Sequence, residues 1–555
     1  MATVKHMKWW GWGVDGVSFH HEDKPALRPF VIKAVGIDLD QPAEGELTLD
    51  DLPMPAPLIT PELLAELTTA VGAEHVHSDR LDRIVHTYGK SLRDLLRLRA
   101  GDIPRVPDVV VYPADESQVQ QIVDSAVAAD AVLIPFGGGS NISGSLQAPA
   151  DETRAVISVD LGRLNQVIDI DKESGLARIQ AGALGPDIEE QLGKKGWTLG
   201  HFPDSFTHST LGGWVATRSS GMQSDKYGDI AQITRGLRVV QPGKVLVIRP
   251  LPGTSTGPSV REMILGSEGR LGVITEVTAQ VHPIPEERVV LGYFFPSWEA
   301  GLAAVQEISF SDATPSIARV SDAGETKFSF ATRKKSKGVS SLVSKGLMKF
   351  LQRKGWDLDQ ICLSFVGYEG GKAHVARNKS LVKDIVTKHG GIVVGKGPGA
   401  LYDQKKFDTP YIRDYLLDRG AAADVSETAG PWSRLQEIYD NATGAVREVY
   451  DRLGVTGWVM CHLSHSEHSG ACLYFTFAFG HDGTDPIGHY DQVKSAIQQT
   501  FVEHGGTLSH HHAVGTEHAR WLEQDISAAG VHLVDGLFAA TDPGRNFNPG
   551  KIIAK

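Results

Sequence analysis

The strongest constraint on the fold is a loop of three glycines that directly follows an apolar run. Residues 132–134 (VLI) predict the end of a buried strand, and residues 135–141 then read PFGGGSN. Because glycine lacks a side chain, the main-chain N–H groups of such a turn can approach a phosphate. The spacing matches neither G-x-G-x-x-G nor G-x-x-x-x-G-K-[ST], which argues against a nicotinamide-type crossover and a nucleoside triphosphatase. The loop therefore predicts a diphosphate site in another dinucleotide-binding fold.

Two further loops of small residues follow along the chain. Residues 203–209 (PDSFTHS) lead into residues 212–221 (GGWVATRSSG), and residues 266–275 read GSEGRLGVIT. In order and separation, the three loops resemble the FAD-binding domain of the vanillyl-alcohol oxidase and p-cresol methylhydroxylase superfamily. Within that superfamily the chain is most similar to the alkyldihydroxyacetonephosphate synthase family. The likeness runs nearly end to end and includes the segments MKWWGWG (7–13), ADETR (150–154), STGP (255–258), YIRD (411–414) and SHHH (509–512).

This resemblance implies an α+β fold, with a two-subdomain FAD-binding domain and an antiparallel-sheet cap that holds the substrate. We accordingly expect a helical N-terminal segment (1–105), an FAD-binding domain (106–285), a substrate or cap domain (286–508) and a C-terminal segment (509–555) that returns to the flavin. A chain of 555 residues exceeds the size at which one hydrophobic core stops growing, which also predicts two or more domains.

Local patterns predict individual elements. Thr60 and Pro61 form a cap and first turn, and Asp115 with Gln118 predicts a capping box before a helix. The remaining patterns predict strands over 109–112, 360–366 and 391–394, a hairpin of 167–170 with 177–181, and helices over 298–309 and 430–452.

Charge and composition restrict the partners and the compartment. The net charge of −12 argues against nucleic-acid binding, which needs a basic face. The three cysteines lack metal-ligand spacing, as expected for a reducing compartment without structural disulfides. We find no signal peptide, no apolar stretch of transmembrane length and no Ser-Lys-Leu peroxisomal signal at the C-terminus. We therefore expect a cytoplasmic protein.

The resemblance carries FAD contacts onto matching positions. Those expected at the diphosphate and ribityl chain are Pro135, Phe136, Gly137, Gly138, Gly139, Ser140, Asn141, Pro203, Asp204, Ser205 and Ser209. Those expected at the isoalloxazine and adenine ends are Ala216, Thr217, Arg218, Ser219, Glu268, Gly269, Leu271, Gly272, Val273 and Ile274. Many superfamily members attach FAD through a histidine where Ser140 stands here. A serine hydroxyl cannot make that bond, so we expect noncovalent FAD.

The resemblance also names residues for chemistry. Arg319 and Arg413 match arginines that the family uses for activity and for the substrate's phosphate, and a guanidinium suits phosphate because it offers bidentate donors. The tract His510, His511 and His512 matches one that the family places over the flavin for proton transfer. On an extended segment at most two of these three can address one cavity.

Glu467 occupies the position that we align with the family's catalytic tyrosine. A carboxylate has an unperturbed pKa of about 4.3 against about 10 for tyrosine, so the replacement weakens the synthase assignment. Glu467 with His462, His465, His468 and the tract at 510–512 could instead form a metal site, as in flavin-linked D-2-hydroxy-acid dehydrogenases of the superfamily, which residues 548–551 (NPGK) also resemble. A solvated histidine-rich strand edge is about as plausible, so we assign no metal.

Residues 333–354 carry a basic amphipathic pattern. Such a helix could rest on an anionic membrane and admit a lipid, although a solvated helix is the more frequent outcome.

Three functions are consistent with the sequence. The first is the family's exchange of the acyl chain of acyl-dihydroxyacetone phosphate for a fatty alcohol, in which the flavin does no net redox work and the enzyme is a homodimer. The second is an FAD-linked D-2-hydroxy-acid dehydrogenase or oxidase. The third is a flavin- or lipid-binding protein without turnover.

Overall fold

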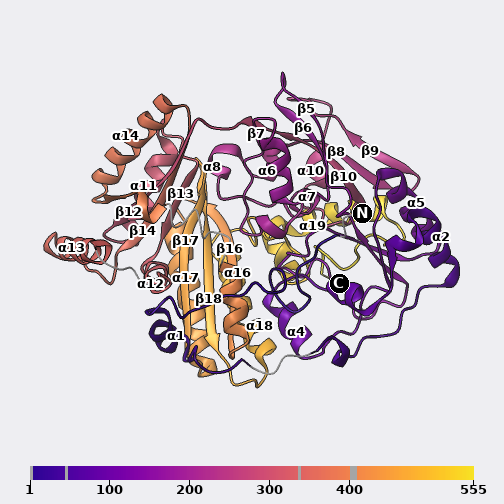
Figure 1. The fold of residues 1–555 in the computed structure, drawn as a ribbon, viewed down its shortest axis with the longest axis horizontal. Coiled ribbons are helices and arrows are strands. Elements are labelled where there is room, and N and C mark those ends of the chain that lie inside the picture. The colour runs from indigo at the N-terminus through magenta and orange to yellow at the C-terminus, as the bar shows by residue number, and fades with distance from the viewer. Residues whose placement is uncertain (1–3, 44–47, 335–338, 400–408, 555) are drawn as a thin grey trace.

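The glycine loops belong to a unit built on two sheets. The computed structural model describes residues 4–43, 48–334, 339–399 and 409–554 (Figure 1). The first sheet has the order β1-β2-β4-β3, and its central pairs β2/β4 and β4/β3 are parallel. Helices α2 and α5 pack together beside it. The bounds are β1 Val76–His77, β2 Val109–Val111, β3 Val132–Phe136, β4 Val156–Asp160, α2 Pro61–Val71 and α5 Glu116–Ala128.

The second sheet of this unit is antiparallel, with the order β5-β6-β10-β8-β9. It carries the loops that follow the glycine loop in sequence. Its strands are β5 Val167–Asp171, β6 Leu176–Gln180, β8 Thr234–Gln241, β9 Lys244–Ile248 and β10 Val273–Gln280, with a separate pair β7 Trp197–Thr198 and β11 His282–Pro283. Its helices are α6 Gly185–Gly193, α7 Leu211–Thr217, α8 Ser224–Tyr227, α9 Ile230–Ile233 and α10 Val260–Ile264.

A seven-stranded antiparallel sheet forms the other half of the molecule, on the left of Figure 1. Its order is β15-β12-β14-β13-β17-β18-β16. One face packs on helices in a core that contains Phe475, Phe477 and Phe479, and the other face turns toward the glycine loops. The strands are β12 Glu287–Phe295, β13 Ile317–Ser321, β14 Cys362–Gly370, β15 Ile392–Gly395, β16 Ala421–Pro431, β17 Gly457–Ser466 and β18 Gly470–Gly480; the helices that pack on the core face are α11 Trp298–Phe310, α14 Lys372–Lys388, α17 Leu435–Leu453 and α18 Pro486–Glu503.

The segments near the two ends of the chain pack on different halves of the molecule. Helix α1 (Leu27–Val35) packs against β16 and against α16 (Thr409–Leu417), while α3 (Arg80–Val85) and α4 (Leu92–Arg99) follow in the N-terminal region. After α19 (Leu522–Thr541) the chain runs beside β3, where the N–H of Leu133 donates to the carbonyl of Asn546 and the N–H of Asn548 donates back to Leu133. The C-terminal segment is thus part of the glycine-loop unit.

Most of the predicted elements are present. The side chain of Thr60 accepts the Leu63 N–H at 3.3 Å, and β5 and β6 form the predicted hairpin. The capping box before α5 is only half formed, because the side chain of Gln118 accepts from Ala114 instead of Asp115. Helix α17 begins at Leu435 and not near Gly430, since Gly430 and Pro431 complete β16.

The basic segment forms α13 (Val339–Arg353), near α12 (Ala323–Ala331). Residues 335–338, and the side chains up to 345, lie outside the described part of the structure. In the remainder, Leu347, Met348 and Leu351 pack against the sheet, while Phe350 is exposed. Among the described residues, we find no helix with both the length and the apolarity needed to cross a bilayer.

Candidate active site

One large cavity joins the glycine loops to the open face of the seven-stranded sheet. Its first wall is made where the two glycine-rich loops meet. A Cβ atom on Gly137 would collide with Oγ1 of Thr210, and one on Gly138 would collide with the carbonyl oxygen of His208. Gly139 has a φ of 66°, which favours glycine. The loops can pack this closely only without side chains, and they leave a wall of main chain that fits a diphosphate.

Most of the predicted FAD contacts line this cavity, and three do not. Those in the wall are Pro135 to Asn141, Pro203, Asp204, Ser205, Ser209, Ala216, Thr217, Ser219, Glu268, Gly269, Gly272 and Ile274. Leu271 and Val273 are absent from the wall and pack in the hydrophobic core, to which Ile274 of the wall also belongs. Arg218 ends α7 with a left-handed backbone, and its exposed guanidinium pairs with Glu262 at 3.1 Å. These three residues are corrections to the predicted site.

Glu268 lines the cavity, but its carboxylate is already bound by the protein. It accepts the N–H groups of Val514 and Gly515 at 2.9–3.0 Å and the hydroxyl of Ser145 at 2.5 Å. Its part in the site is therefore to tie the C-terminal segment to the cradle.

Three strands of the sheet place His462, Tyr474 and Glu427 in one row, and the first two of these side chains line the cavity. In the β17/β18 ladder His462 lies opposite Tyr474, and in the β16/β18 ladder Glu427 lies opposite the same Tyr474. The ring of Tyr474 is nearly parallel to two imidazoles, His462 at 4.8 Å and His511 at 5.9 Å between ring centres. Desolvation, with the negative charges of Asp204 and Glu427, raises the pKa of Tyr474 well above its ordinary value. The phenol is therefore protonated at neutral pH.

Arg319 lies beside this row on β13 and shares a buried carboxylate with His462. Glu325, in the first turn of α12, accepts from a terminal nitrogen of Arg319 and lies 3.0 Å from Nδ1 of His462. Burial alone would raise the pKa of Glu325, but His462 and Arg319 hold it at about 2. An ionised Glu325 thus orients both side chains toward the cavity.

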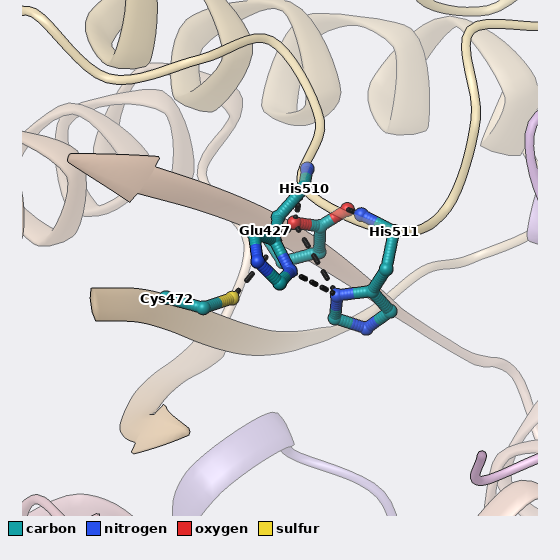
Figure 2. A group of neighbouring side chains, drawn as sticks. All are labelled: Glu427, Cys472, His510 and His511. Carbon is teal, nitrogen blue, oxygen red and sulfur yellow. Dashed lines mark hydrogen bonds and ion pairs between the residues drawn. The ribbon is translucent and has the colours of Figure 1, made fainter. Parts of the chain in front are cut away.

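The histidine tract approaches the row from the C-terminal segment. His511 and His512 line the cavity, whereas His510 lies behind them with its Nδ1 3.1 Å from that of His511 (Figure 2). Two of the three histidines thus face the cavity, although the segment is a bend and not a strand. A bulge in β17 gives His465 a φ of 50° and stacks its ring on His510, with ring centres 5.5 Å apart.

Glu467 does not join this group. It lies exposed in the turn between β17 and β18, where its N–H donates to the carbonyl of Gly470, and it is absent from the cavity wall. His468 is exposed beside it and packs on Phe310. The structure does not bring Glu467 to the cavity, where it was expected to replace a catalytic tyrosine, because it lies in the turn beyond the ends of the two strands. The structure brings Tyr474 to the reactive row instead.

Arg413, on α16, lines the cavity between the cradle and the N-terminal segment. Two of its nitrogens donate to Asp414 at 3.0 and 3.2 Å, and a third donates to the carbonyl of Lys90 at 2.5 Å. The other carboxylate oxygen of Asp414 accepts the N–H of Trp12, whose ring also lines the cavity. These contacts hold the guanidinium of Arg413 in one orientation in the cavity wall, where it can bind an anion.

An apolar arm of the cavity leads away from the reactive row along the strands. The next row holds Met460, Thr476 and Val425, and the one after it holds Trp458, Ala478 and Ala423. Four residues of strand from Tyr474 to Ala478 span about 13 Å. The far end is covered by α1 through Phe30, Val31, Ala34 and Val35. This arm suits a long hydrocarbon chain.

The comparisons with known proteins agree with this geometry. Residues 107–248 match the family model described as an FAD binding domain, and residues 284–552 match that of the C-terminal domain of FAD linked oxidases. The alkyldihydroxyacetonephosphate synthase of Dictyostelium discoideum is 36% identical, over 99% of this chain and 94% of its own. The chain belongs to the alkyldihydroxyacetonephosphate synthase family.

Solved structures support the same assignment. An alkyldihydroxyacetonephosphate synthase structure matches with a TM-score of 0.86 and 34% identity, covering 98% of each chain. The fold also occurs in p-cresol methylhydroxylase, at a TM-score of 0.64 and 17% identity over 89% of this chain and 96% of the other. The chain is thus an FAD-dependent enzyme of the alkylglycerone-phosphate synthase type, and the comparisons do not favour the dehydrogenase alternative.

The sequence interpretation missed Tyr474, Glu427 and Glu325, and it considered His462 only as a metal ligand. One signal was available for the tyrosine. Residues 471–479 (ACLYFTFAF) alternate, so that Phe475, Phe477 and Phe479 share one face and Tyr474 lies on the other. No local signal marks Glu427, whose partners follow more than eighty residues later in the chain.

Proposed function

We propose that the enzyme exchanges the fatty acid of acyl-dihydroxyacetone phosphate for a fatty alcohol. The ester C–O bond at C1 of dihydroxyacetone breaks, a C–O bond to the alcohol oxygen forms, and the fatty acid leaves. One observation carries this proposal: a single cavity joins a dinucleotide cradle, two arginines, a Tyr-His row and an apolar arm. A hydroxy acid would have no use for that arm.

The residues of the cavity divide the work by their chemistry. FAD, when bound in the cradle, supplies an isoalloxazine ring that undergoes no net oxidation or reduction. Arg413 binds the phosphate, because a guanidinium group pairs with phosphate bidentately, and Arg319 organises the site beside it. Apolar rows of β16, β17 and β18 hold the hydrocarbon chain and exclude water.

Proton transfer falls to Tyr474 and the neighbouring imidazoles. The alcohol must lose its proton as the ether bond forms, and the departing acid gains stabilisation from a nearby donor. Burial lowers the pKa of His511 well below its ordinary value, so this imidazole is neutral and can accept a proton. Tyr474 keeps its proton at neutral pH and can donate it. In this account Tyr474 takes the catalytic position that the sequence interpretation gave to Glu467.

The test supplies the purified yellow protein with palmitoyl-dihydroxyacetone phosphate and hexadecanol under anaerobic conditions. We expect hexadecyl-dihydroxyacetone phosphate and palmitate in equal amounts, with the flavin still oxidised at the end. A panel of D-2-hydroxy acids serves as the contrast. Bleaching of the flavin by a hydroxy acid, without ether product from the lipid pair, would contradict the proposal.

We further propose that FAD is held without a covalent bond, since Ser140 occupies the cradle position at which related proteins carry a histidine. We also propose that the domain boundaries lie at 105/106, 285/286 and 508/509. The enzyme is proposed to be a homodimer in the cytoplasm. Contact with an anionic membrane through residues 333–354 is supported by exposed Lys349, Phe350, Arg353 and Lys354 at the end of α13. Vesicle co-sedimentation with and without anionic lipid tests that contact.

A further inference from the structure

A buried carboxylate on the sheet accepts hydrogen bonds from the histidine tract. Glu427 on β16 is 1% exposed, and its two oxygens accept from four donors of the tract. The hydroxyl of Ser509 donates at 2.8 Å, and the main-chain N–H groups of His510, His511 and His512 donate at 2.7, 3.0 and 3.0 Å. Three successive N–H groups that converge on one anion form a nest, and here the occupant is the protein's own side chain.

The same carboxylate belongs to the reactive row. Glu427 lies directly opposite Tyr474 in the β16/β18 ladder, so the strand that carries the phenol and the strand that carries the anchor are hydrogen-bonded neighbours. The nest therefore fixes the distance between the tract and the phenol. His511 lies nearly parallel to Tyr474 at 17°, and His512 meets it edge-on with ring centres 5.4 Å apart.

A metal ion is a competing explanation for these residues. Glu427, Cys472, His510 and His511 each offer a ligand atom within 4.8 Å of the others (Figure 2). However, Oε1 of Glu427 already accepts from three donors of the tract and Oε2 from a fourth, and the thiol of Cys472 also points at Oε2, at 3.9 Å. Burial raises the pKa of Cys472 well above its ordinary value, so the thiol keeps its proton and can point it at Glu427. The contacts are those of a hydrogen-bonded anion.

We propose that Glu427 is a positioning residue for the reaction, whose carboxylate fills the nest of the histidine tract and thereby holds His511 and His512 against Tyr474. This inference rests on the proposed function for its effect on turnover, but the geometry it describes can be measured without turnover.

The charge of Glu427 also acts on the two imidazoles. Burial lowers the pKa values of His511 and His512, the latter to about 4, and the negative charge of Glu427 opposes that shift in both. The other charged or titratable groups around them are His462 and His465 on β17, Tyr474 and Cys472 on β18, Lys494 on α18, and His510 and His518 of the C-terminal segment. Removal of Glu427 should therefore lower both imidazole pKa values further.

Chemical rescue tests this role. Glu427→Ala empties the nest, and we expect kcat to fall about 100-fold, the effect of misplacing catalytic groups by about an ångström. Formate is small enough for the vacated nest and should raise the kcat of Glu427→Ala at least tenfold, with no effect on the wild type. Glu437→Ala on the exposed side of α17, where Glu437 pairs with Arg434 and His504, is the matched control and should change nothing. If Glu427→Ala fails to retain FAD, Glu427→Gln is measured in its place.

A readout independent of turnover separates this inference from the proposed function. In protein labelled with ¹⁵N-histidine, the His511 and His512 resonances, assigned through His511→Asn and His512→Asn, should shift in Glu427→Ala because the rings are no longer held against Tyr474. Formate should reverse the shift. Unchanged resonances, or a folded Glu427→Ala enzyme with wild-type kcat, would overturn the inference. Absence of ether product from the wild type would overturn the proposed function alone.

Discussion

Tyr474 and His462 lie side by side on β18 and β17, with ring centres 4.8 Å apart and ring planes 20° from parallel. The imidazole is held in this place by Glu325, 3.0 Å from its Nδ1. A phenol and an imidazole in contact, both in the cavity wall, form the centre of the proton-transfer machinery proposed for this enzyme.

Glu325→Gln should damage both stability and turnover. The change removes the buried negative charge that Arg319 and His462 share, which costs about 3 kcal/mol of unfolding free energy. It also frees the ring of His462, and we expect kcat to fall about 100-fold because the reactive row loses its alignment. Urea denaturation and initial rates measure the two effects. Glu307→Gln, which removes an exposed partner of Lys388 and His389, is the control and should leave both unchanged.

Gly138→Ala should empty the cradle of FAD. The added methyl group would collide with the carbonyl oxygen of His208, so the two loops must separate at a cost of about 1–3 kcal/mol. We expect the protein to purify colourless, as measured by flavin absorbance per mole of protein. Gly444→Ala, inside α17 with open space around it, should keep its FAD and gain up to about 1 kcal/mol in stability.

Ala34→Phe should shorten the chain that the enzyme accepts. Ala34 lies on the inner side of α1 at the far end of the apolar arm. A phenyl ring there should lower kcat/KM for hexadecanol about tenfold or more, with a much smaller effect on octanol. Ile32→Phe adds a similar bulk on the outer side of the same helix, where Ile32 is 42% exposed. Equal losses for both alcohols, or for both variants, would contradict the placement of the chain.

His201 makes stability depend on pH in a defined direction. Burial lowers its pKa to about 3, whereas an unfolded histidine titrates near 6.5. Between pH 3 and pH 6.5, His201 is protonated in the unfolded chain but neutral in the native protein. Its burial therefore destabilises the fold progressively as the pH falls below 6.5. Relative to His201→Gln, the wild type should lose about 1.4 kcal/mol more per pH unit from 6.5 toward 4. Parallel stability curves would show that His201 is not buried as a neutral ring.

The sequence predicts the cradle better than the reactive row, for physical reasons. Gly137 and Gly138 are dictated locally, because only glycine lets two loops approach so closely, and their pattern is visible in a few residues. The row of His462, Tyr474 and Glu427 depends on the register of three strands, which no segment specifies alone. Without that register, the sequence interpretation chose Glu467 as the catalytic residue. Glu467 is only seven residues from Tyr474, but it lies in an exposed turn.

The other errors of the predicted site are single residues within the predicted loops. Gly272 and Ile274 contribute to the cavity wall, whereas Leu271 and Val273 lie only in the core, a distinction that a loop-level resemblance does not make. Arg218 turns outward because its left-handed backbone ends α7. The resemblance thus located the loops, and the structure decided which side chains of each loop can reach a ligand.

The most direct test of this account compares Tyr474→Phe with Glu467→Gln in the ether-forming assay, at equal FAD content. The account predicts that Tyr474→Phe lowers kcat by at least about 100-fold, since it removes the proton donor, while Glu467→Gln stays within about twofold of the wild type. The reverse pattern, with Glu467→Gln inactive and Tyr474→Phe active, would contradict the assignment of the acid role to the row on the sheet.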